Sequence, residues 1–405
     1  MRLSYIHTDK PDCACPLCSK KRSIFRIKQI LKPDFQSNSP APFVGRFGYP
    51  NINVGILSPP ERQENAWEYD APRHWASMKY PIPKIIDFRS ELVNSAKKVN
   101  VYDRDRFLSL AQEIGMASRP VDVDVSLESV PKFTLTPDSH LAPMGPHARL
   151  KKAELTSNPH IDTRVDKAVD DTDLKAVEAM TTLYDKGFEE NFLTKLLSVG
   201  TLGIGENRKL VPTRWSITAT DDMLGKHLIK EIRDYPEADY QMFAGSHLGN
   251  YYFILLFSEK WSYELFETFV PRQQDITWST DFEPNKGRTN YAEDTAGGYY
   301  TVRLAILEKL RQSKRQASAL AIRVITEEYT TPLGVWVTRE AARNAMRSKP
   351  LEFASKELLL EYIRKKIQNE FGFLPDPMLR RSKLLSQMRQ AKLSSFFSTT
   401  HAFGS

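Results

Sequence analysis

The sequence predicts an α+β fold with mixed helices and largely antiparallel strands. Several segments carry apolar residues at helical spacing, others are short apolar runs of strand length, and the two kinds do not alternate in a βαβ rhythm. With 405 residues, 41% of them hydrophobic, the chain can build the cores of two domains. At its ends we expect a small N-terminal metal-binding knuckle and a flexible C-terminal tail.

Charge and hydropathy limit the function classes. The chain has 57 basic and 50 acidic residues, and its formal net charge of +7 is compatible with a nucleic-acid partner. It contains no apolar run of membrane-spanning length, and its first residues lack the apolar stretch of a signal peptide. We therefore expect a cytoplasmic protein with no membrane partner.

The cysteines predict a metal site. All three, Cys13, Cys15 and Cys18, lie in one short segment, and an odd cluster of thiols makes a poor disulfide framework. Three thiolates suit a tetrahedral structural zinc ion whose fourth ligand comes from elsewhere, and His7 is the nearest candidate. Reduced thiols without metal and an iron–sulfur cluster are the alternatives.

A basic run follows the cysteines. Lys20, Lys21 and Arg22 lead into apolar residues at helical spacing up to Leu31. The open face of such a helix could lie along phosphates, although an ordinary surface helix has the same pattern. The three cations are therefore candidate nucleic-acid contacts.

The next segment, 33–83, is rich in proline, glycine and aromatic residues and predicts extended chain. Within it, a glycine turn at 45–50 precedes an alternating apolar pattern from Ile52 to Ile56, which is typical of a strand. Arg46 lies between glycines, where the backbone lets a phosphate approach closely. A surface arginine in a turn is the alternative.

The middle of the chain is mainly helical in its spacing. Val121, Val123 and Val125 alternate with polar residues and predict a half-exposed strand. The helices that apolar spacing and following glycines predict here cover 103–114, 173–187 and 192–200, and the last two form a helical hairpin.

The segment 211–222, Val-Pro-Thr-Arg-Trp-Ser-Ile-Thr-Ala-Thr-Asp-Asp, leads into a helix with apolar residues from Leu224 onward. Asp221 and Asp222 are then expected at the helix N-terminus, where carboxylates cap free amides and complement the macrodipole. In the functional alternative the two carboxylates converge with Arg214 and Trp215 on one turn, as a phosphate- or base-handling site needs.

His247 is a further candidate for this central site. It precedes a near-continuous apolar run at 251–257, which together with 261–265 predicts an antiparallel hairpin. Beyond a surface linker at 271–290, the spacing predicts a helix over 300–310, strands over 320–325 and 334–337, and a helix over 355–371 that stops at Gly372.

The C-terminal end carries a compact apolar pattern formed by Gln390, Leu393, Phe396 and Phe397. In a 3₁₀ turn, residues three apart share one edge, so these side chains would form an exposed apolar plug with one amide beside it. The pattern resembles the box with which replication and repair proteins bind the sliding clamp PCNA.

A structural alternative exists for the same stretch. Leu384, Leu385, Met388 and Leu393 have the spacing of one face of a last amphipathic helix. That helix would fold back onto its own domain.

Together these features resemble one known family, the archaeal Nre DNA repair proteins. The resemblance rests on five features of the sequence: the cysteine cluster, the turn at 45–50, the segment 211–222, Ala-Gly-Gly-Tyr-Tyr at 296–300 and the terminal box. The resemblance implies a role in DNA damage repair or tolerance through PCNA, and no established reaction. The cysteine cluster is shorter than a four-cysteine finger.

Four parts are expected along the chain. They are a Cys-rich zinc-binding segment with a basic helix (1–32), a main α+β domain (33–285), a smaller C-terminal α/β domain (286–375) and a tail with the clamp box (376–405).

Two function classes stay open on this basis. The first is an adaptor that is recruited to PCNA, contacts DNA and is nucleoid-associated when bound to the clamp. The second is a clamp-tethered enzyme with its site around Arg214, Asp221, Asp222 and His247. Acidic residues with a metal would suit a nuclease, and a His/Tyr/Glu pocket would suit an NAD-using ADP-ribosyl transferase.

Overall fold

The computed structural model describes residues 29–133, 145–270 and 276–389. These residues belong to two compact units, which are described separately. The first unit runs to Leu224 and includes Thr330–Gly334, and the second contains Gly225–Tyr329 and the chain from Val335 onward. Among the described residues, no helix has the length and hydropathy needed to span a membrane.

The first unit is built on a six-stranded sheet with the order β1-β5-β6-β4-β3-β2. Every neighbouring pair is antiparallel except β4 and β6, which are parallel. The predicted alternation at Val121, Val123 and Val125 is confirmed, because all three side chains are buried. The strands are β1 Asp34–Ser39, β2 Ala41–Val44, β3 Asn51–Ser58, β4 Val93–Asn100, β5 Val121–Leu127 and β6 His147–Leu155.

Helices complete this unit. Apolar spacing predicted four of them, whereas the two helices at 66–70 and 72–77 lie in 33–83, where extended chain was expected. The carboxylate of Asp105 accepts a hydrogen bond from Leu108 N (2.9 Å) and so caps α4. The predicted helical hairpin is confirmed as α6 and α7, which contact each other. The helices are η1 Ala66–Asp70, α2 Pro72–Ser77, α3 Ile82–Glu91, α4 Arg106–Met116, α5 Thr163–Asp170, α6 Ala176–Asp185, α7 Glu190–Ser198, η2 Gly205–Asn207 and α8 Thr213–Ile232, which continues into the second unit.

The second unit is built on a sheet with the order β10-β9-β11-β8-β7-β12. Its strands are β7 Tyr240–His247, β8 Asn250–Phe257, β9 Ser262–Phe269, β10 Thr277–Glu283, β11 Ser318–Ile325 and β12 Leu351–Phe353.

The predicted hairpin between β8 and β9 is wrong, because β11 lies between them. β11 pairs antiparallel with β8 and parallel with β9. All eight of its residues are buried, and the middle of a sheet is where such a strand removes most apolar surface from water. The hairpin partner of β8 is β7, and the two are joined by Leu248 and Gly249 in the left-handed backbone conformation.

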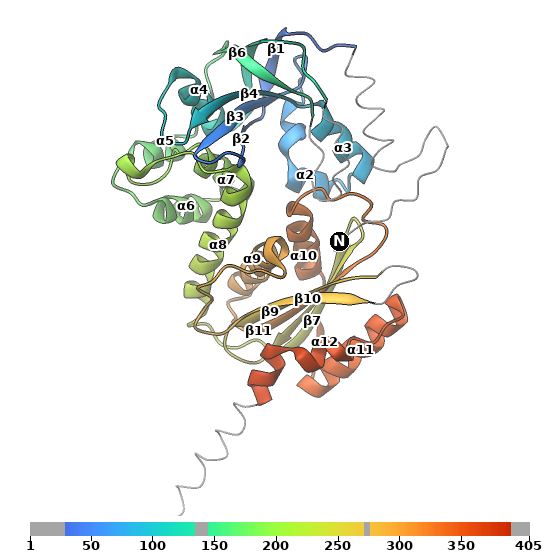
Figure 1. Ribbon diagram of the computed structural model, residues 1–405. Coiled ribbons are helices and arrows are strands. Elements are labelled where there is room, and N and C mark those ends of the chain that lie inside the picture. Colours follow the sequence, from blue (N-terminus) through green and yellow to red (C-terminus); the bar gives the residue numbers. More distant parts are fainter. Residues whose placement is uncertain (1–28, 134–144, 271–275, 390–405) are drawn as a thin grey trace, which may run out of the picture. The chain divides into compact units, whose positions relative to one another are not determined.

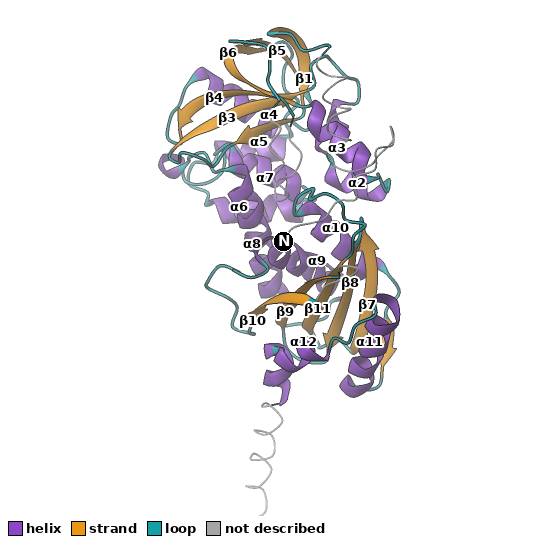
Figure 2. Ribbon diagram, turned by 45° about the vertical axis from the view of Figure 1, so that its right-hand side comes forward, coloured by secondary structure: helices purple, strands orange, loops and turns teal. Residues whose placement is uncertain are grey.

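Helices cover both faces of this sheet. α9 and α10 lie on one face, and α11 and α12 lie on the other (Figure 1, Figure 2). The predicted strand at 334–337 is wrong, because α10 begins at Trp336. The predicted helix over 355–371 is confirmed, with Ser355 as its N-cap and Gly372 as its left-handed C-cap. The helices are α9 Ala296–Ser313, α10 Trp336–Arg347, α11 Lys356–Phe371 and α12 Asp376–Arg381, and residues 383–389 are also helical.

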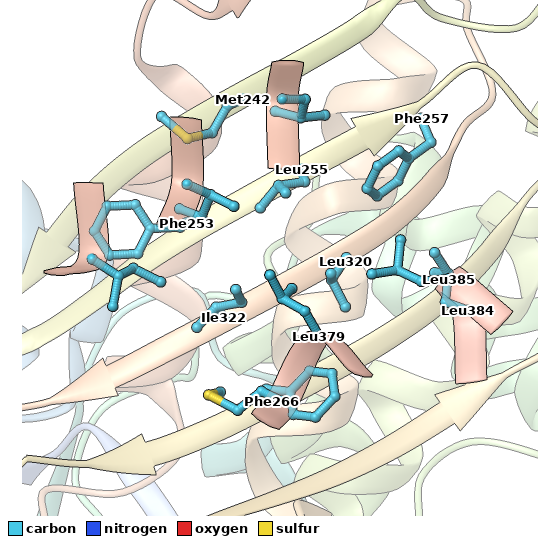
Figure 3. Close-up of a cluster of buried hydrophobic side chains, with 14 of the residues drawn as sticks. Met242, Phe253, Leu255, Phe257, Phe266, Leu320, Ile322, Leu379, Leu384 and Leu385 are labelled. Carbon is cyan, nitrogen blue, oxygen red and sulfur yellow. The ribbon is translucent and has the colours of Figure 1, made fainter. Parts of the chain in front are cut away.

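The core under α11 and α12 includes the last described helix. Figure 3 shows Leu379, Leu384 and Leu385 beside sheet residues such as Phe266 and Leu320. Met388 belongs to the same buried cluster. For residues 384–388, the alternative in which the last helix packs on its own domain is therefore confirmed.

A buried carboxylate fixes the start of this helix. Glu264 on β9 is fully buried and accepts hydrogen bonds from Ser382 Oγ (2.5 Å), Lys383 N (3.1 Å) and Leu384 N (3.0 Å). Burial raises the pKa of Glu264, while the bonds from Ser382 and the two amides oppose that rise. The carboxylate thus joins the sheet to the helix that directly precedes the clamp box.

The α+β class with largely antiparallel strands is confirmed. Cys13, Cys15, Cys18, His7, the basic run 20–22 and the box residues 390–397 lie outside the described residues. The metal-binding knuckle, the flexible tail and the four sequence-based domain boundaries stay predictions.

We expect Glu264→Ala to loosen the last helix. The substitution leaves the amides of Lys383 and Leu384 and the hydroxyl of Ser382 without their acceptor, which costs about 1 to 3 kcal/mol for buried donors. Hydrogen exchange should show faster exchange over 383–389 than in the wild type. The exposed Glu361→Ala on α11 is the control, and equal protection in Glu264→Ala and the wild type would refute the anchoring role.

Candidate functional site

Two segments that are distant in sequence meet at the start of α8. Val44 N donates a hydrogen bond to Thr213 Oγ1 (3.0 Å), and the hydroxyl of Ser198 lies 3.1 Å from the same oxygen. Ser198 Oγ also donates to Val211 O (2.9 Å). These bonds place the turn at 45–50 against the first turn of α8.

The turn itself needs its glycine. Gly48 has a φ of +80°, which side-chain-bearing residues rarely adopt. Asn51 N donates to Gly48 O (2.8 Å), and Gly45 N donates to Asn53 O (2.8 Å). These bonds define the backbone conformation of the turn that carries Arg46, Phe47 and Tyr49.

Aromatic and basic side chains gather where the two segments meet. The rings of Tyr49 and Trp215 have centroids 5.3 Å apart, and the Arg46 guanidinium lies 4.7 Å from the ring centroid of Phe47. Phe47 is 75% exposed and Trp215 is 46% exposed. Neither Arg46 nor Arg214 makes an ion pair with any residue that the structure describes. Both cations are thus available to an external anion.

The same surface continues along the end of β3 and β4. Val101 N donates to Pro50 O (3.0 Å), and Leu210 N donates to Val101 O (3.0 Å). Tyr102 is 61% exposed, and the amine of Lys209 lies 5.6 Å from its ring centroid. We call this region the aromatic–basic surface; its residues are Arg46, Phe47, Tyr49, Tyr102, Lys209, Arg214 and Trp215.

This combination has a defined chemical use. Exposed aromatic rings offer stacking platforms to nucleobases, and arginine or lysine side chains beside them bind phosphates. A single exposed aromatic residue would be ordinary, whereas four of them interleaved with three cations are typical of a single-stranded nucleic-acid surface.

The carboxylates of the predicted central site do not lie on this turn. Asp221 and Asp222 were expected at a helix N-terminus, and that prediction is wrong because α8 begins at Thr213, more than two turns earlier. Asp221 is fully buried, and both carboxylates interact with other residues. The structure brings the turn that carries Arg46 against the start of α8, which carries Arg214 and Trp215. It places the two acids further along the helix.

The physical reason is the composition of the buried face of α8. Ser216, Thr220, Leu224, Leu228 and Ile232 are all buried and are spaced four residues apart. In the first two turns this face carries small hydroxyl residues, so an apolar periodicity is visible only from Leu224 onward. Sequence spacing therefore placed the helix start too late.

The described residues contain no cluster of three or more His, Cys, Asp or Glu side chains that could hold a metal ion. Within these residues the nuclease alternative has no cluster of three protein ligands to support it, and it stays a prediction. The transferase alternative stays a prediction.

His247 belongs to the second unit, at the end of β7. Its ring centroid lies 5.9 Å from that of Trp336, and its Nε2 has no hydrogen-bond partner among the described residues. Burial lowers the pKa of His247 to about 4. The imidazole is therefore neutral at physiological pH.

The segment 296–300 has a structural role. A Cβ atom at Gly297 would overlap Val335, and one at Gly298 would overlap the carboxylate of Glu267, so only glycine allows α9 to begin this close to the sheet. Tyr299 then donates its hydroxyl hydrogen to Glu283 (2.9 Å).

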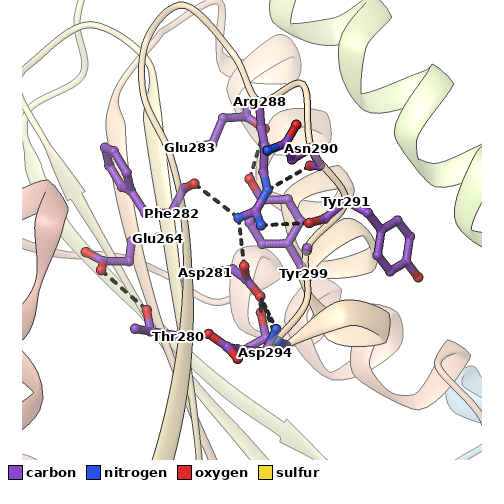
Figure 4. A network of polar contacts seen from close by, with 12 residues as sticks. Glu264, Thr280, Asp281, Phe282, Glu283, Arg288, Asn290, Tyr291, Asp294 and Tyr299 are labelled. Atoms are coloured by element: carbon purple, nitrogen blue, oxygen red, sulfur yellow. Dashed lines mark hydrogen bonds and ion pairs between the residues drawn. The ribbon is translucent and has the colours of Figure 1, made fainter.

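A polar network holds the loop before α9 (Figure 4). Asp281 pairs with Arg288 (2.7 Å) and accepts from Asp294 N (3.0 Å) and Thr295 N (2.7 Å). Arg288 also donates to Tyr291 O (2.8 Å). These bonds give the polar residues of the loop before α9 partners within the protein itself.

Comparison with known proteins was made against family models, curated proteins and solved structures. The model described as "Archaeal Nre, N-terminal" matches residues 12–278, and the model described as "Archaeal Nre, C-terminal" matches residues 283–396. The chain belongs to the archaeal Nre family. The two Nre models together cover the turn at 45–50, all of α8 and most of the terminal box.

Curated Nre proteins are similar over most of their length. The DNA repair protein NreA of Haloferax volcanii is 37% identical over 340 residues, which are 80% of this chain and 81% of that protein. The DNA repair protein NreB of Archaeoglobus fulgidus is 35% identical over 391 residues, which are 94% of this chain and 96% of that protein. The DNA repair protein NreA of the same species is 35% identical over 370 residues, 88% and 90% of the two chains. No solved structure matches the chain.

Sequence reasoning missed part of this Nre surface. Arg46, Arg214 and Trp215 were candidates, whereas Phe47, Tyr49, Tyr102 and Lys209 were not. The signal was present for Phe47 and Tyr49, which flank the turn glycine Gly48. Tyr102 and Lys209 join the surface only through the backbone bond between Leu210 and Val101.

We expect acid to destabilise the protein through His247. A histidine whose pKa falls from 6.5 to about 4 on folding contributes stability above pH 6.5, and loses it as the pH falls from 6.5 to 4, because the unfolded chain takes up the proton first. At pH 5 the free energy of unfolding is lower by about 2 kcal/mol than it is above the pKa of the unfolded chain. His247→Phe removes this titration. The measurement is urea unfolding at pH 8 and pH 5, and equal pH dependence of the two proteins would contradict a buried neutral histidine.

Proposed function

We propose that this chain is a DNA repair protein that binds single-stranded DNA with its aromatic–basic surface and is recruited to the sliding clamp PCNA by the box Gln390, Leu393, Phe396 and Phe397. The observation that carries the DNA part is the contact of the turn at 45–50 with α8, which groups Phe47, Tyr49 and Trp215 with Arg46 and Arg214. The backbone bonds of Val101 add Tyr102 and Lys209 beside them. The names of the Nre relatives support the repair role.

Electrostatics support DNA as the ligand. The net charge of +7 favours association with a polyanion, and the cations of the surface would each replace counterions on a phosphate. Stacking on an aromatic ring is tolerant of base identity, so this surface should bind without strong sequence preference. That property fits a protein that meets damage at arbitrary sequences.

Two features support recruitment by the box. Its spacing places one amide and three apolar side chains on one edge of a short turn. It also begins directly after helix 383–389, whose residues Leu384, Leu385 and Met388 are buried in the second unit. The described part of the core therefore reaches the helix that immediately precedes the box.

We also propose a structural zinc ion on Cys13, Cys15 and Cys18, with His7 as the candidate fourth ligand. Three thiolates in six residues support it. Elemental analysis of purified protein should give about one zinc per chain, because structural zinc binds tightly enough to survive purification. Cys15→Ser should lose the metal, and a stable, metal-free wild type would contradict the proposal.

We expect Trp215→Ala to weaken binding of a single-stranded oligonucleotide. One base stacked on an aromatic side chain contributes about 1 to 3 kcal/mol, so the dissociation constant should rise about 5- to 150-fold. Fluorescence anisotropy with a labelled oligonucleotide measures this. Tyr291→Ala is the control, because Tyr291 is 54% exposed on the second unit and outside the surface. Unchanged affinity in Trp215→Ala, with a normal melting temperature, would count against the surface.

We expect the double variant Phe396→Ala and Phe397→Ala to lose clamp binding. Burial of two phenylalanine side chains contributes roughly 3 to 6 kcal/mol, so their removal should weaken binding at least about 100-fold. Titration calorimetry of the full chain with PCNA measures this. Phe403→Ala is a matched control in the same tail, and a double variant that binds PCNA like the wild type would overturn the role of the box.

A further inference from the structure

A second concave site lies in the first unit, apart from the residues of the aromatic–basic surface. It is a pocket of about 350 Å³ that is formed by η1 and α2, the loop between α4 and β5, and the first turns of α7. This volume is within the range of small-molecule sites. The residues that matter to its chemistry are Trp67, Asp70, Arg73, Arg119, Phe192 and Lys195.

Lys195 is the unusual group in this pocket. Its amine donates a hydrogen bond to Pro40 O (3.2 Å) and lies 5.6 Å from the ring centroid of Phe192. It makes no ion pair with a described residue. Desolvation lowers the pKa of Lys195, and the charge of Asp70 only partly opposes this.

Two buried arginines, in contrast, each have a carboxylate partner. Arg303 pairs with Glu283 (2.6 Å), and Arg323 pairs with Glu267 (2.6 Å). A desolvated cation without a carboxylate is costly unless something else supplies the negative charge. Lys195 has no such carboxylate partner among the described residues, so its amine is open to an anion from outside the chain.

The acids that line the pocket are already engaged. Asp70 lies 3.6 Å from the guanidinium of Arg89 and accepts a hydrogen bond from Asn191 Nδ2 (3.4 Å). Glu189 pairs with Arg73 (3.2 Å).

Arg119 adds a second cation to Lys195. It is exposed at the pocket and pairs with no described carboxylate. The charge left over in the pocket is therefore positive and comes from these two side chains.

An aromatic ring completes the arrangement. Trp67 is 44% exposed, and the edge of His74 packs against it with ring centroids 4.7 Å apart. This contact holds the indole in place at the pocket. A flat apolar ring next to two cations matches a ligand with a planar base and a phosphate.

We propose that this pocket binds a single nucleotide, with the phosphate on Lys195 and Arg119 and the base against Trp67. The nucleotide could be free, or it could be an exposed residue of single-stranded DNA, since both have the same chemistry. The proposal does not depend on the aromatic–basic surface or on the clamp box, because none of its residues belongs to either.

The test is titration calorimetry of the full chain with dAMP, inorganic phosphate and deoxyadenosine. We expect dAMP to bind at least tenfold more tightly than phosphate or the nucleoside, because only dAMP engages both the cations and the indole. Lys195→Met and Trp67→Ala should each lower the dAMP affinity at least tenfold. Lys98→Met, at an exposed position on β4, is the matched control and should bind like the wild type.

Thermal melting separates binding from folding. Lys195→Met removes a desolvated charge and keeps the side-chain length, so it should not lower the melting temperature. dAMP should raise the melting temperature of the wild type and of Lys98→Met, and leave that of Lys195→Met unchanged. If Lys195→Met binds dAMP like the wild type, or if phosphate alone binds as tightly as dAMP, the proposal is overturned.

A single-stranded oligonucleotide then identifies the source of the nucleotide. The background is Trp215→Ala, in which the aromatic–basic surface is impaired. If Lys195→Met weakens oligonucleotide binding further, the pocket accepts nucleotides within a strand. If it weakens only dAMP binding, the ligand is a free nucleotide. Both results support the proposal, whereas no effect on either ligand contradicts it.

Discussion

The hydrogen bond from Val44 N to Thr213 Oγ1 joins residues that are 169 positions apart in the sequence, and the candidate DNA surface depends on it. It fixes the turn that carries Arg46, Phe47 and Tyr49 against the first turn of α8. Without this contact, Tyr49 in its turn and Trp215 on α8 would each be one exposed aromatic residue of no special meaning. A surface assembled in this way is preorganised, so DNA would bind with a smaller cost in side-chain ordering.

Local patterns predicted several helices and strands, because helical spacing, alternation and capping residues are local signals. Examples are Ser355 and Gly372 at the ends of α11, and the valines of β5. The helices at 66–70 and 72–77 were missed, since the proline- and glycine-rich segment around them indicates extended chain. Pairing across the second sheet was not predictable: β11 enters between β8 and β9 because it is buried throughout, and burial is decided by the whole unit. The start of α8 was missed because its buried face begins with Ser216 and Thr220, which carry no apolar signal.

The candidate site was predictable to a similar degree. Arg46, Arg214 and Trp215 stood out because of neighbouring glycines and hydroxyl residues, and the structure brings their segments together. Tyr102 and Lys209 could not be found, since only long-range backbone bonds bring them there. The acids Asp221 and Asp222 were grouped with Arg214 by their closeness in sequence. In a helix, however, such a separation places residues about two turns apart along the axis.

One chain then carries two proposed contacts. They are the aromatic–basic surface for DNA in the first unit and the box that follows a core-anchored helix in the second. The most direct test is the dissociation rate of the protein from primed DNA with and without loaded PCNA. Linking two weak contacts on one chain should slow dissociation at least about 100-fold on clamp-loaded DNA. Trp215→Ala, or the double variant Phe396→Ala and Phe397→Ala, should each abolish this gain. A dissociation rate that is the same with and without the clamp would contradict the account.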